Sequence, residues 1–228
     1  MDIKSKRLAE QINKLKYNNQ DVKFNLGVLI LLVLCTFLIV ISTFTQIDFK
    51  HYIIPFETFA PDADWVQMLA EGKFSKHYQF IPQIPVIMFI ALLLGRKYGI
   101  ISVSLYILIG LFLAPVFALG GGIDYIFQYG FGYILGYVPA IFFAASILRS
   151  GLSFRNMLQA TIVGVITIHI VGSLYFLFIA TIQKETSSFI MGWLVAQSGT
   201  KILYDIFFSF IAMICAKFTK KFLWFAIG

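Results

Sequence analysis

Charged residues are scarce in this sequence, and cysteine is nearly absent. Asp, Glu, Lys and Arg make up 13% of the 228 residues, whereas 59% are hydrophobic and the mean hydropathy is +0.85. A single soluble core cannot bury so much apolar side chain, which excludes an ordinary water-soluble domain. The two cysteines, Cys35 and Cys215, lie inside apolar runs without metal-ligand spacing or a secreted disulfide pattern, so we expect them to be packing residues.

Enzyme signatures are also missing. The sequence contains no HExxH, GxSxG, CxxC or P-loop pattern, and no pair of intramembrane aspartates typical of a membrane aspartyl protease. We therefore expect no catalytic residue, no metal site, no cofactor and no ATP hydrolysis by the chain itself. The net charge of +7 is not gathered into a patch with interleaved aromatics, which argues against a nucleic-acid partner.

Long apolar runs dominate what the sequence does contain. A bilayer core of about 30 Å requires about 20 helical residues. Six runs approach that length, over 26–47, 81–95, 99–119, 131–148, 157–182 and 200–218. The sequence therefore predicts an all-α, polytopic membrane protein with six transmembrane helices over 26–228. The first run starts too late for the apolar core of a secretory signal, so we interpret it as a retained span.

Lys and Arg are distributed unevenly between alternate connections. Thirteen lie on one side, together with both ends of the chain and the connections at Arg96 and Arg149, and five lie on the other side. Cytoplasmic connections carry the excess of positive charge. We therefore expect a multi-pass protein of the cell (cytoplasmic) membrane with both termini in the cytoplasm.

The segment before the first span, residues 1–25, is a basic tail. Leu8, Ile12 and Leu15 recur in it at helical spacing among lysines. The tail is either an amphipathic helix on the anionic inner leaflet or a solvated positive anchor.

The first external connection, 48–80, is long for a link between two helices and rich in aromatic residues. Such a segment is either interfacial padding or a lid over the outer face. Asp62 or Asp64 is expected to cap a short helix that runs through Ala70 and stops at Gly72.

Ionisable side chains are rare inside the spans, where each costs about 2.5–3.5 kcal/mol to insert. Asp205 lies about 8 Å below the outer end of the last span, and Lys201 lies one helical turn above it. The two either form an ion pair with each other or contact a ligand. His169 in the fifth span is interpreted as a neutral histidine bonded to a neighbouring helix, with ligand contact or proton relay as the alternative.

The orientation places a wider set of polar and aromatic side chains at the same outer side. The candidate ligand-binding residues are Gln83, Asp124, Tyr125, Gln128, Tyr133, Lys201, Tyr204 and Asp205. Tyrosines gather at membrane interfaces in any case, so the joint occurrence favours a binding site. The glycines at 120–122 and in the fourth run either bring backbone against a ligand or pack helices tightly.

The central segment carries an ordered series of motifs. They are Gln83 ahead of the second run, GRKYG at 95–99, Tyr106 and Gly110, PVFALGGG at 115–122 and FGYILGY at 131–137. In this order and spacing, the segment from Pro82 to Tyr137 resembles the BioY family, the biotin-specific membrane S components of energy-coupling factor (ECF) transporters.

The resemblance implies a six-helix S-component bundle that binds biotin near its outer face, with the connection 48–80 as a gate. It also implies as partners an ECF transmembrane coupling protein and ATPase subunits that drive release inside. Asp205 matches the family's aspartate on the last span, whereas Phe208 stands where the family has a lysine. Lys201, one turn away on the other side, offers a replacement cation.

Biotin suits the candidate residues chemically. Its ureido ring offers two N–H donors and a carbonyl, which fit Asp205 with Gln83 or Asp124, and its carboxylate needs a cation such as Lys201. Two alternatives stay open at this point: an S component for another small vitamin or metabolite, and a membrane scaffold without a ligand site.

Overall fold

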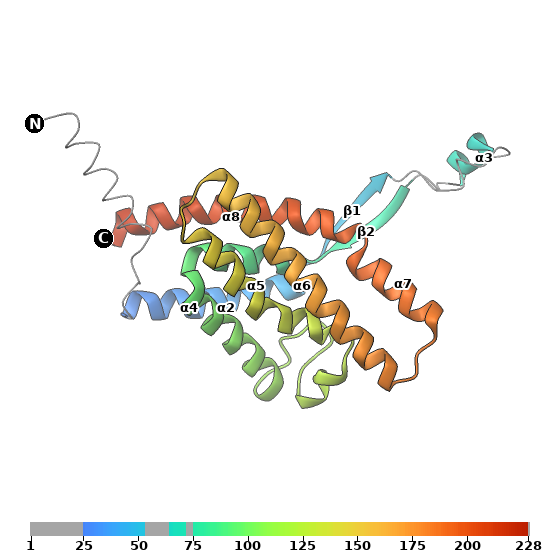
Figure 1. Ribbon diagram of the computed structural model, residues 1–228, viewed down its shortest axis with the longest axis horizontal. Coiled ribbons are helices and arrows are strands. Elements are labelled where there is room, and N and C mark those ends of the chain that lie inside the picture. The colour runs from blue at the N-terminus through green and yellow to red at the C-terminus, as the bar shows by residue number, and fades with distance from the viewer. Residues whose placement is uncertain (1–24, 53–63, 72–74, 228) are drawn as a thin grey trace, which may run out of the picture.

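The computed structural model describes residues 25–52, 64–71 and 75–227, and five long helices dominate it (Figure 1). They are α2 (Leu26–Phe44), α4 (Gln83–Phe112), α5 (Phe131–Leu148), α6 (Phe154–Ile182) and α8 (Lys201–Ile227). In the described part of the chain, five helical stretches are long and apolar enough to cross a membrane. The all-α membrane fold predicted from the apolar runs is thereby confirmed. The predicted basic tail lies outside the described residues except for Asn25, whose side chain caps α2 by accepting from the N–H of Val28 at 2.9 Å.

The helix α4 contains both the second and the third predicted spans. Gly95 interrupts it with φ 70° and ψ −169°, a conformation that glycine adopts without steric cost. The green helix changes direction near its middle in Figure 1, so five helices provide six helical segments. The turn was predicted at the right place, but the residues after Gly95 are helical, and the helix ends at Phe112 instead of continuing to 119.

A cation from the far end of the chain stabilises this break. The first segment of α4 ends at Gly95, which leaves its last carbonyls without intrahelical donors. Lys220 Nζ on α8 donates to the carbonyl oxygen of Leu92 at 3.4 Å. A lysine at a helix C-terminus also interacts favourably with the helix dipole.

The connection 48–80, which was predicted to be external, contains a β-hairpin that the sequence analysis did not predict. β1 (Ile47–Tyr52) pairs antiparallel with β2 (Ser75–Phe80), with Ile47 opposite Phe80. Each strand mixes charged and aromatic residues, so the alternation of apolar and polar side chains that marks a strand is weak. The expected short helix is confirmed as α3 (Trp65–Ala70), whose first N–H groups donate to Asp64 Oδ1, whereas Asp62 and Gly72 lie outside the described residues.

Two further short elements lie in the connections between the long helices. The 3₁₀ helix η2 (Ile123–Phe127) follows the glycine run, and α7 (Ser187–Ser198) joins α6 to α8. The sequence analysis left both as connections, since neither is long enough to span a bilayer. None of the residues of α7 is buried in the chain, so this helix lies on the surface of the bundle.

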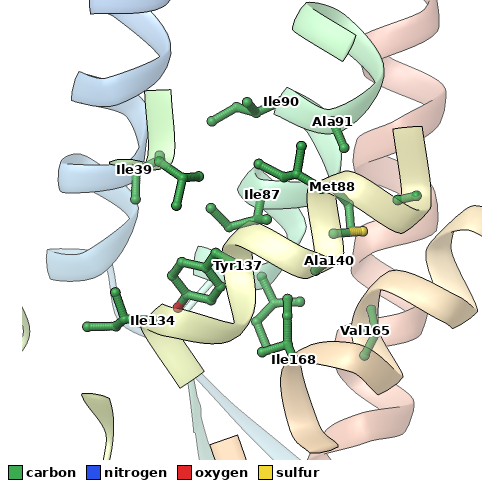
Figure 2. Close-up of a cluster of buried hydrophobic side chains, with 14 of the residues drawn as sticks. Ile39, Ile87, Met88, Ile90, Ala91, Ile134, Tyr137, Ala140, Val165 and Ile168 are labelled. Carbon is green, nitrogen blue, oxygen red and sulfur yellow. The ribbon is translucent and has the colours of Figure 1, made fainter. Parts of the chain in front are cut away.

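The core forms where α5 packs against α6 and where α4 packs against α5 and α8 (Figure 2). Ile87, Met88, Ala140 and Ile168 are fully buried there. Glycines permit the close approach of α5 and α6, since a Cβ atom on Gly132 would lie 2.2 Å from the Cβ of Tyr175. The glycines of the fourth run therefore serve helix packing.

The outward faces of the helices are apolar, as a lipid solvent requires. On α2 the exposed large hydrophobic residues are Leu26, Leu29, Ile30, Val33, Leu34, Phe37, Ile41 and Phe44. In Figure 1 the start of α2, the break in α4, the α5–α6 connection and the end of α8 all lie toward the left of the view, and the hairpin lies to the right. The fold thus gathers the basic connections at one end of the bundle.

Candidate functional site

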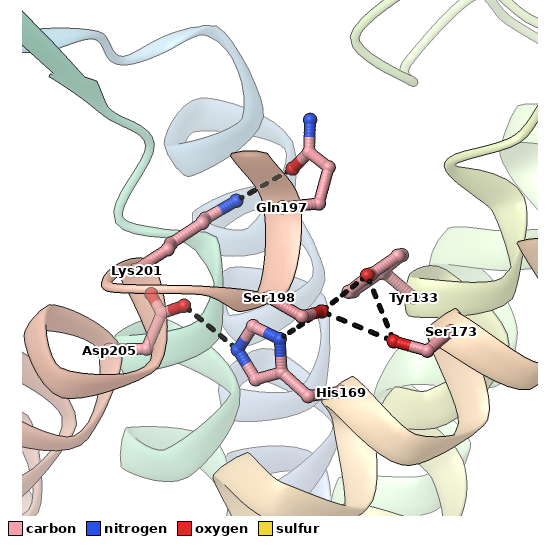
Figure 3. A network of polar contacts seen from close by, with 7 residues as sticks. All are labelled: Tyr133, His169, Ser173, Gln197, Ser198, Lys201 and Asp205. Atoms are coloured by element: carbon pink, nitrogen blue, oxygen red, sulfur yellow. Dashed lines mark hydrogen bonds and ion pairs between the residues drawn. The ribbon is translucent and has the colours of Figure 1, made fainter. Parts of the chain in front are cut away.

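A buried carboxylate, that of Asp205, lies at the end of a polar network between α5, α6, α7 and α8 (Figure 3). Asp205 has no exposed surface, and His169 Nε2 lies 3.1 Å from its Oδ2 atom. This contact confirms the interpretation of His169 as a histidine bonded to a neighbouring helix. The other oxygen, Asp205 Oδ1, is buried without a hydrogen-bond partner in the described part of the chain, as is the hydroxyl of Ser209.

Ser198, the last residue of α7, connects His169 to the rest of the network. Its Oγ lies 3.0 Å from His169 Nδ1, 2.6 Å from the hydroxyl of Tyr133 and 3.2 Å from Ser173 Oγ. An ionised Asp205 only accepts hydrogen bonds, so a neutral His169 must carry its proton on Nε2 and accept at Nδ1. Ser198 then donates to His169, while the other two hydroxyls are placed to donate to Ser198. The hydrogen bonds of the network are thus all donated in the direction of the Asp205 carboxylate.

Lys201 points away from Asp205. Its Nζ donates to Gln197 Oε1 at 3.3 Å, and in the described part of the chain the hydrogen-bond partner of the Asp205 carboxylate is His169. Of the two sequence-based alternatives, the intrahelical ion pair is therefore not the arrangement in this structure. A half-buried ammonium held by one neutral amide keeps most of its capacity to bind an anion.

A cleft opens beside the network between α6 and α8. Its volume is about 330 Å³, within the range of about 300–1,000 Å³ that is usual for small-molecule sites. Its walls are formed by Ile166, His169, Ile170, Ser173, Leu174, Ser198 and Ile202. Three residues of the network, His169, Ser173 and Ser198, thus take part in the walls of this apolar cleft, whereas Asp205 is buried behind them.

Gln83 belongs to a second polar cluster, where α2 meets the two segments of α4. Its Nε2 donates to Thr43 Oγ1 and to the Tyr106 hydroxyl, both at 2.9 Å, and these two hydroxyls lie 3.1 Å apart. The buried phenol of Tyr137 on α5 is close enough to Tyr106 and Asp205 to interact electrostatically with both. Tyr137 therefore interacts with a member of each cluster.

The remaining candidates lie apart from the network. Asp124 and Gln128 are exposed at η2. Tyr125 is buried, with its ring centroid 4.5 Å from that of Phe117, and this burial raises the pKa of its phenol. Tyr204 is half-buried on α8. Of the eight predicted residues, the structure brings Tyr133 and Asp205 into one network, and Lys201 lies beside it, bonded to Gln197.

Aromatic contacts attach α7 to the bundle. The ring of Trp193 stacks on Phe176 of α6 with centroids 4.0 Å apart, and Tyr129 makes ring contacts with both. The hydroxyl of Tyr129 donates to the Glu185 carboxylate at 2.5 Å, and this bond raises the pKa of the Tyr129 phenol. The contacts fix the helix that carries Ser198.

The sequence analysis missed Ser173, Ser198, Gln197 and Tyr137 as members of the site region. Ser173 had a usable signal, because it lies four residues after His169 and therefore on the same helical face. No pattern in the sequence pointed to Ser198, since its contacts are with residues of α5 and α6 that are distant in the sequence.

Comparisons with known proteins agree with one another. Residues 73–224 match the family model described as the BioY family. A protein of Lysinibacillus sphaericus described as a probable biotin transporter BioY is 35% identical over 98 residues, which are 42% of this chain and 50% of that protein. The chain therefore matches about half the length of this curated relative.

A solved structure has the same fold. It is that of the S-component for biotin from an ECF-type ABC transporter, which covers 86% of this chain and 91% of its own at a TM-score of 0.60 and 21% identity. The S-component-like bundle expected from the sequence is thereby confirmed.

Proposed function

The chain belongs to the BioY family, and from this premise we propose that it is the biotin-binding membrane subunit of an ATP-driven, ECF-type vitamin uptake transporter. The proposal rests on the carboxylate of Asp205, of which only one oxygen has a hydrogen-bond partner in the described residues. Its Oδ2 is bonded to His169, whereas its buried Oδ1 has no donor in the described residues. A buried acceptor without a partner costs about 1–3 kcal/mol, which a ligand N–H group would recover.

The ureido ring of biotin supplies such donors. In the proposed complex Asp205 accepts a ureido N–H, and His169 holds the carboxylate in place from α6. The ammonium of Lys201, one turn above Asp205, binds the carboxylate of the ligand in place of the amide of Gln197. Tyr133, with its hydroxyl in the same network and its ring near His169, offers an aromatic wall for the thiophane ring. Gln83, Asp124, Tyr125, Gln128 and Tyr204 remain candidates of lower rank, because their side chains lie outside this network.

Transport requires partners in this proposal. The sequence has no P-loop, so ATP hydrolysis falls to ATPase subunits, and an ECF transmembrane coupling protein connects them to this chain. We infer that the chain itself is not an enzyme and takes biotin as cargo, without a cofactor. Its basic end faces the cytoplasm of the cell membrane by the positive-inside rule, which places the network toward the outer side.

The proposed gate over the outer face is the connection 48–80. In its described part, Phe80 at the end of β2 is almost fully buried and packs on Phe208 of α8, with ring centroids 4.7 Å apart. Phe208 lies one helical turn from Asp205, so the hairpin is anchored beside the proposed ligand.

Equilibrium binding to the purified full-length chain tests the function. We expect saturable binding of labelled biotin at one site, competed by unlabelled biotin but not by thiamine or riboflavin. Binding of a different vitamin from the panel would favour the second candidate, an S component for another small metabolite, which the phenylalanine at position 208 motivates. A well-folded protein that binds none of them would exclude both and favour a scaffold role.

A further inference from the structure

Ser198 links α7 to the polar network that ends at Asp205 (Figure 3). It is the last residue of α7, and its Oγ lies 3.0 Å from His169 Nδ1 and 2.6 Å from the Tyr133 hydroxyl. The carboxylate of Asp205 lies on the other side of the same imidazole, 3.1 Å from Nε2. Ser198 therefore contacts the ring nitrogen of His169 that Asp205 does not use.

The neighbouring hydroxyl groups decide where the proton of Ser198 points. A serine hydroxyl has one donor and two acceptor positions. The Tyr133 hydroxyl and Ser173 Oγ, at 2.6 Å and 3.2 Å, are both placed to donate to Ser198 and so to occupy its two acceptor positions. The proton of Ser198 is then directed to Nδ1 of His169. A nitrogen that accepts this bond carries no proton, so the imidazole is neutral and donates from Nε2.

The protonation state of His169 decides how strongly Asp205 accepts a further hydrogen bond. An imidazolium at this position would pair with the carboxylate and withdraw negative charge from it, whereas a neutral ring leaves the charge in place. Hydrogen bonds to an ionised acceptor are about twice as strong as those between neutral groups. Other titratable groups near the pair include the phenols of Tyr133 and Tyr137 and the ammonium of Lys201, which is bonded to Gln197. Contact with Nδ1 itself comes from Ser198.

Aromatic contacts hold Ser198 in its position. None of the residues of α7 is buried, and Trp193 attaches this helix by stacking on Phe176 with ring centroids 4.0 Å apart and by a ring contact with Tyr133 at 5.8 Å. Trp193 lies five residues before Ser198 on the same helix. The hydroxyl that reaches His169 is therefore supplied by a surface helix, and its position depends on how that helix is attached.

We propose that Ser198 is a positioning residue for ligand binding, and that α7 controls the site by supplying its hydroxyl. Ser198 holds His169 in the neutral form with the proton on Nε2, so that Asp205 stays ionised and its Oδ1 accepts the N–H of the ligand. The inference rests on the proposed function, because it assigns Oδ1 to the ureido group. Ser198 does not touch the ligand and acts through His169. Displacement of α7 removes the donor from Nδ1 and weakens the site.

The ring nitrogens of His169 report this arrangement, because protonated and unprotonated imidazole nitrogens differ widely in ¹⁵N chemical shift. In a background with His51→Gln and His77→Gln, His169 is the only histidine of the chain. Full-length protein labelled with ¹⁵N-histidine and purified through a tag free of histidine then gives one pair of ring signals. At neutral pH we expect an unprotonated Nδ1 and a protonated Nε2. A protonated Nδ1 in this protein would overturn the inference without any change at Ser198.

Three serine variants separate positioning from general damage. Ser198→Ala removes the hydroxyl, Ser198→Thr keeps it, and Ser187→Ala makes the same deletion at the exposed start of α7. Ser198→Ala should lower biotin affinity by about 2- to 12-fold, as loss of one neutral hydrogen bond predicts, and should give a protonated Nδ1 signal. Ser198→Thr should restore both readouts, and Ser187→Ala should change neither. In a folded Ser198→Ala protein, an unchanged spectrum or an unchanged affinity would overturn the inference.

Trp193→Ala tests whether α7 supplies the hydroxyl. The substitution removes the ring that stacks on Phe176, so we expect the same two changes as in Ser198→Ala and little further loss of affinity when the two are combined. A wild-type spectrum in Trp193→Ala would overturn the role of α7. Wild-type protein that fails to bind biotin would overturn the proposed function, whereas a protonated Nδ1 in protein that binds biotin would overturn this inference alone.

Discussion

His169 on α6 and Asp205 on α8 meet through a 3.1 Å contact between Nε2 and Oδ2 in the buried interior of the bundle. The partner of the Asp205 carboxylate is thus His169 on a different helix, and not Lys201 on the same helix. This contact gives the pair two roles, since it joins two helices and orients the oxygen that we assign to the ligand.

Removing the histidine tests the first role. His169→Ala leaves Asp205 buried without its donor, and we expect the free energy of unfolding to fall by about 1.5–3 kcal/mol, the usual contribution of a hydrogen bond to a charged group. Thermal or denaturant unfolding in detergent measures this change. Asp205→Asn in the same background should lose little further stability, because the uncompensated charge is gone; an additive loss would contradict the pairing.

Asp205→Asn tests the second role. The substitution keeps the shape of the side chain but removes the charge and places an amide donor where the ureido group needs an acceptor. A charged hydrogen bond contributes about 1.5–3 kcal/mol, so the affinity for biotin should fall by about 10- to 150-fold. Equilibrium binding measures it, and unchanged affinity in a folded variant would remove Asp205 from the site.

Lys201→Ala separates the two ends of the ligand. Loss of the ammonium should weaken biotin, whose carboxylate needs a cation, and should weaken the primary amide of biotin much less. The ratio of the two affinities is the readout, because general damage to the site would lower both alike. Gln197→Ala is the matched control: it removes the present partner of Lys201 and should not weaken biotin.

Cysteine labelling tests the orientation. Asp124 and Lys97 are both exposed in the structure, so a cysteine at either position is accessible to a reagent on its own side. In a background without Cys35 and Cys215, a membrane-impermeant maleimide added to intact cells should label position 124 and not position 97. Labelling of both positions after permeabilisation is the control. The reverse pattern on intact cells would invert the topology.

Phe80→Ala tests the gate. The substitution removes the ring that packs on Phe208, so the hairpin loses its described anchor on α8, and biotin should exchange faster while the helix content stays unchanged. Stopped-flow exchange and circular dichroism give the two readouts. Phe218→Ala, at an exposed position far along α8, should leave the exchange rate unaltered. A variant that loses its helices would show that the hairpin is structural.

The sequence by itself determined the features that depend on neighbouring residues. The length of the apolar runs predicts a membrane protein because a bilayer requires about 20 residues per span. The Asp64 cap of α3 and the break at Gly95 were also predictable, because capping and a positive φ are properties of a few consecutive residues.

Tertiary structure decided the partners of the polar residues. Helical spacing predicted that Lys201 could reach Asp205 one turn away. In the structure the ammonium of Lys201 instead contacts Gln197 of α7, and the packing of α6 against α8 places His169 beside Asp205. The β-hairpin and the role of Ser198 were likewise beyond local patterns, since they join segments that are distant along the chain. The sequence therefore determined which residues are unusual for a membrane span, whereas the assignment of each to a network needed the three-dimensional arrangement of the helices.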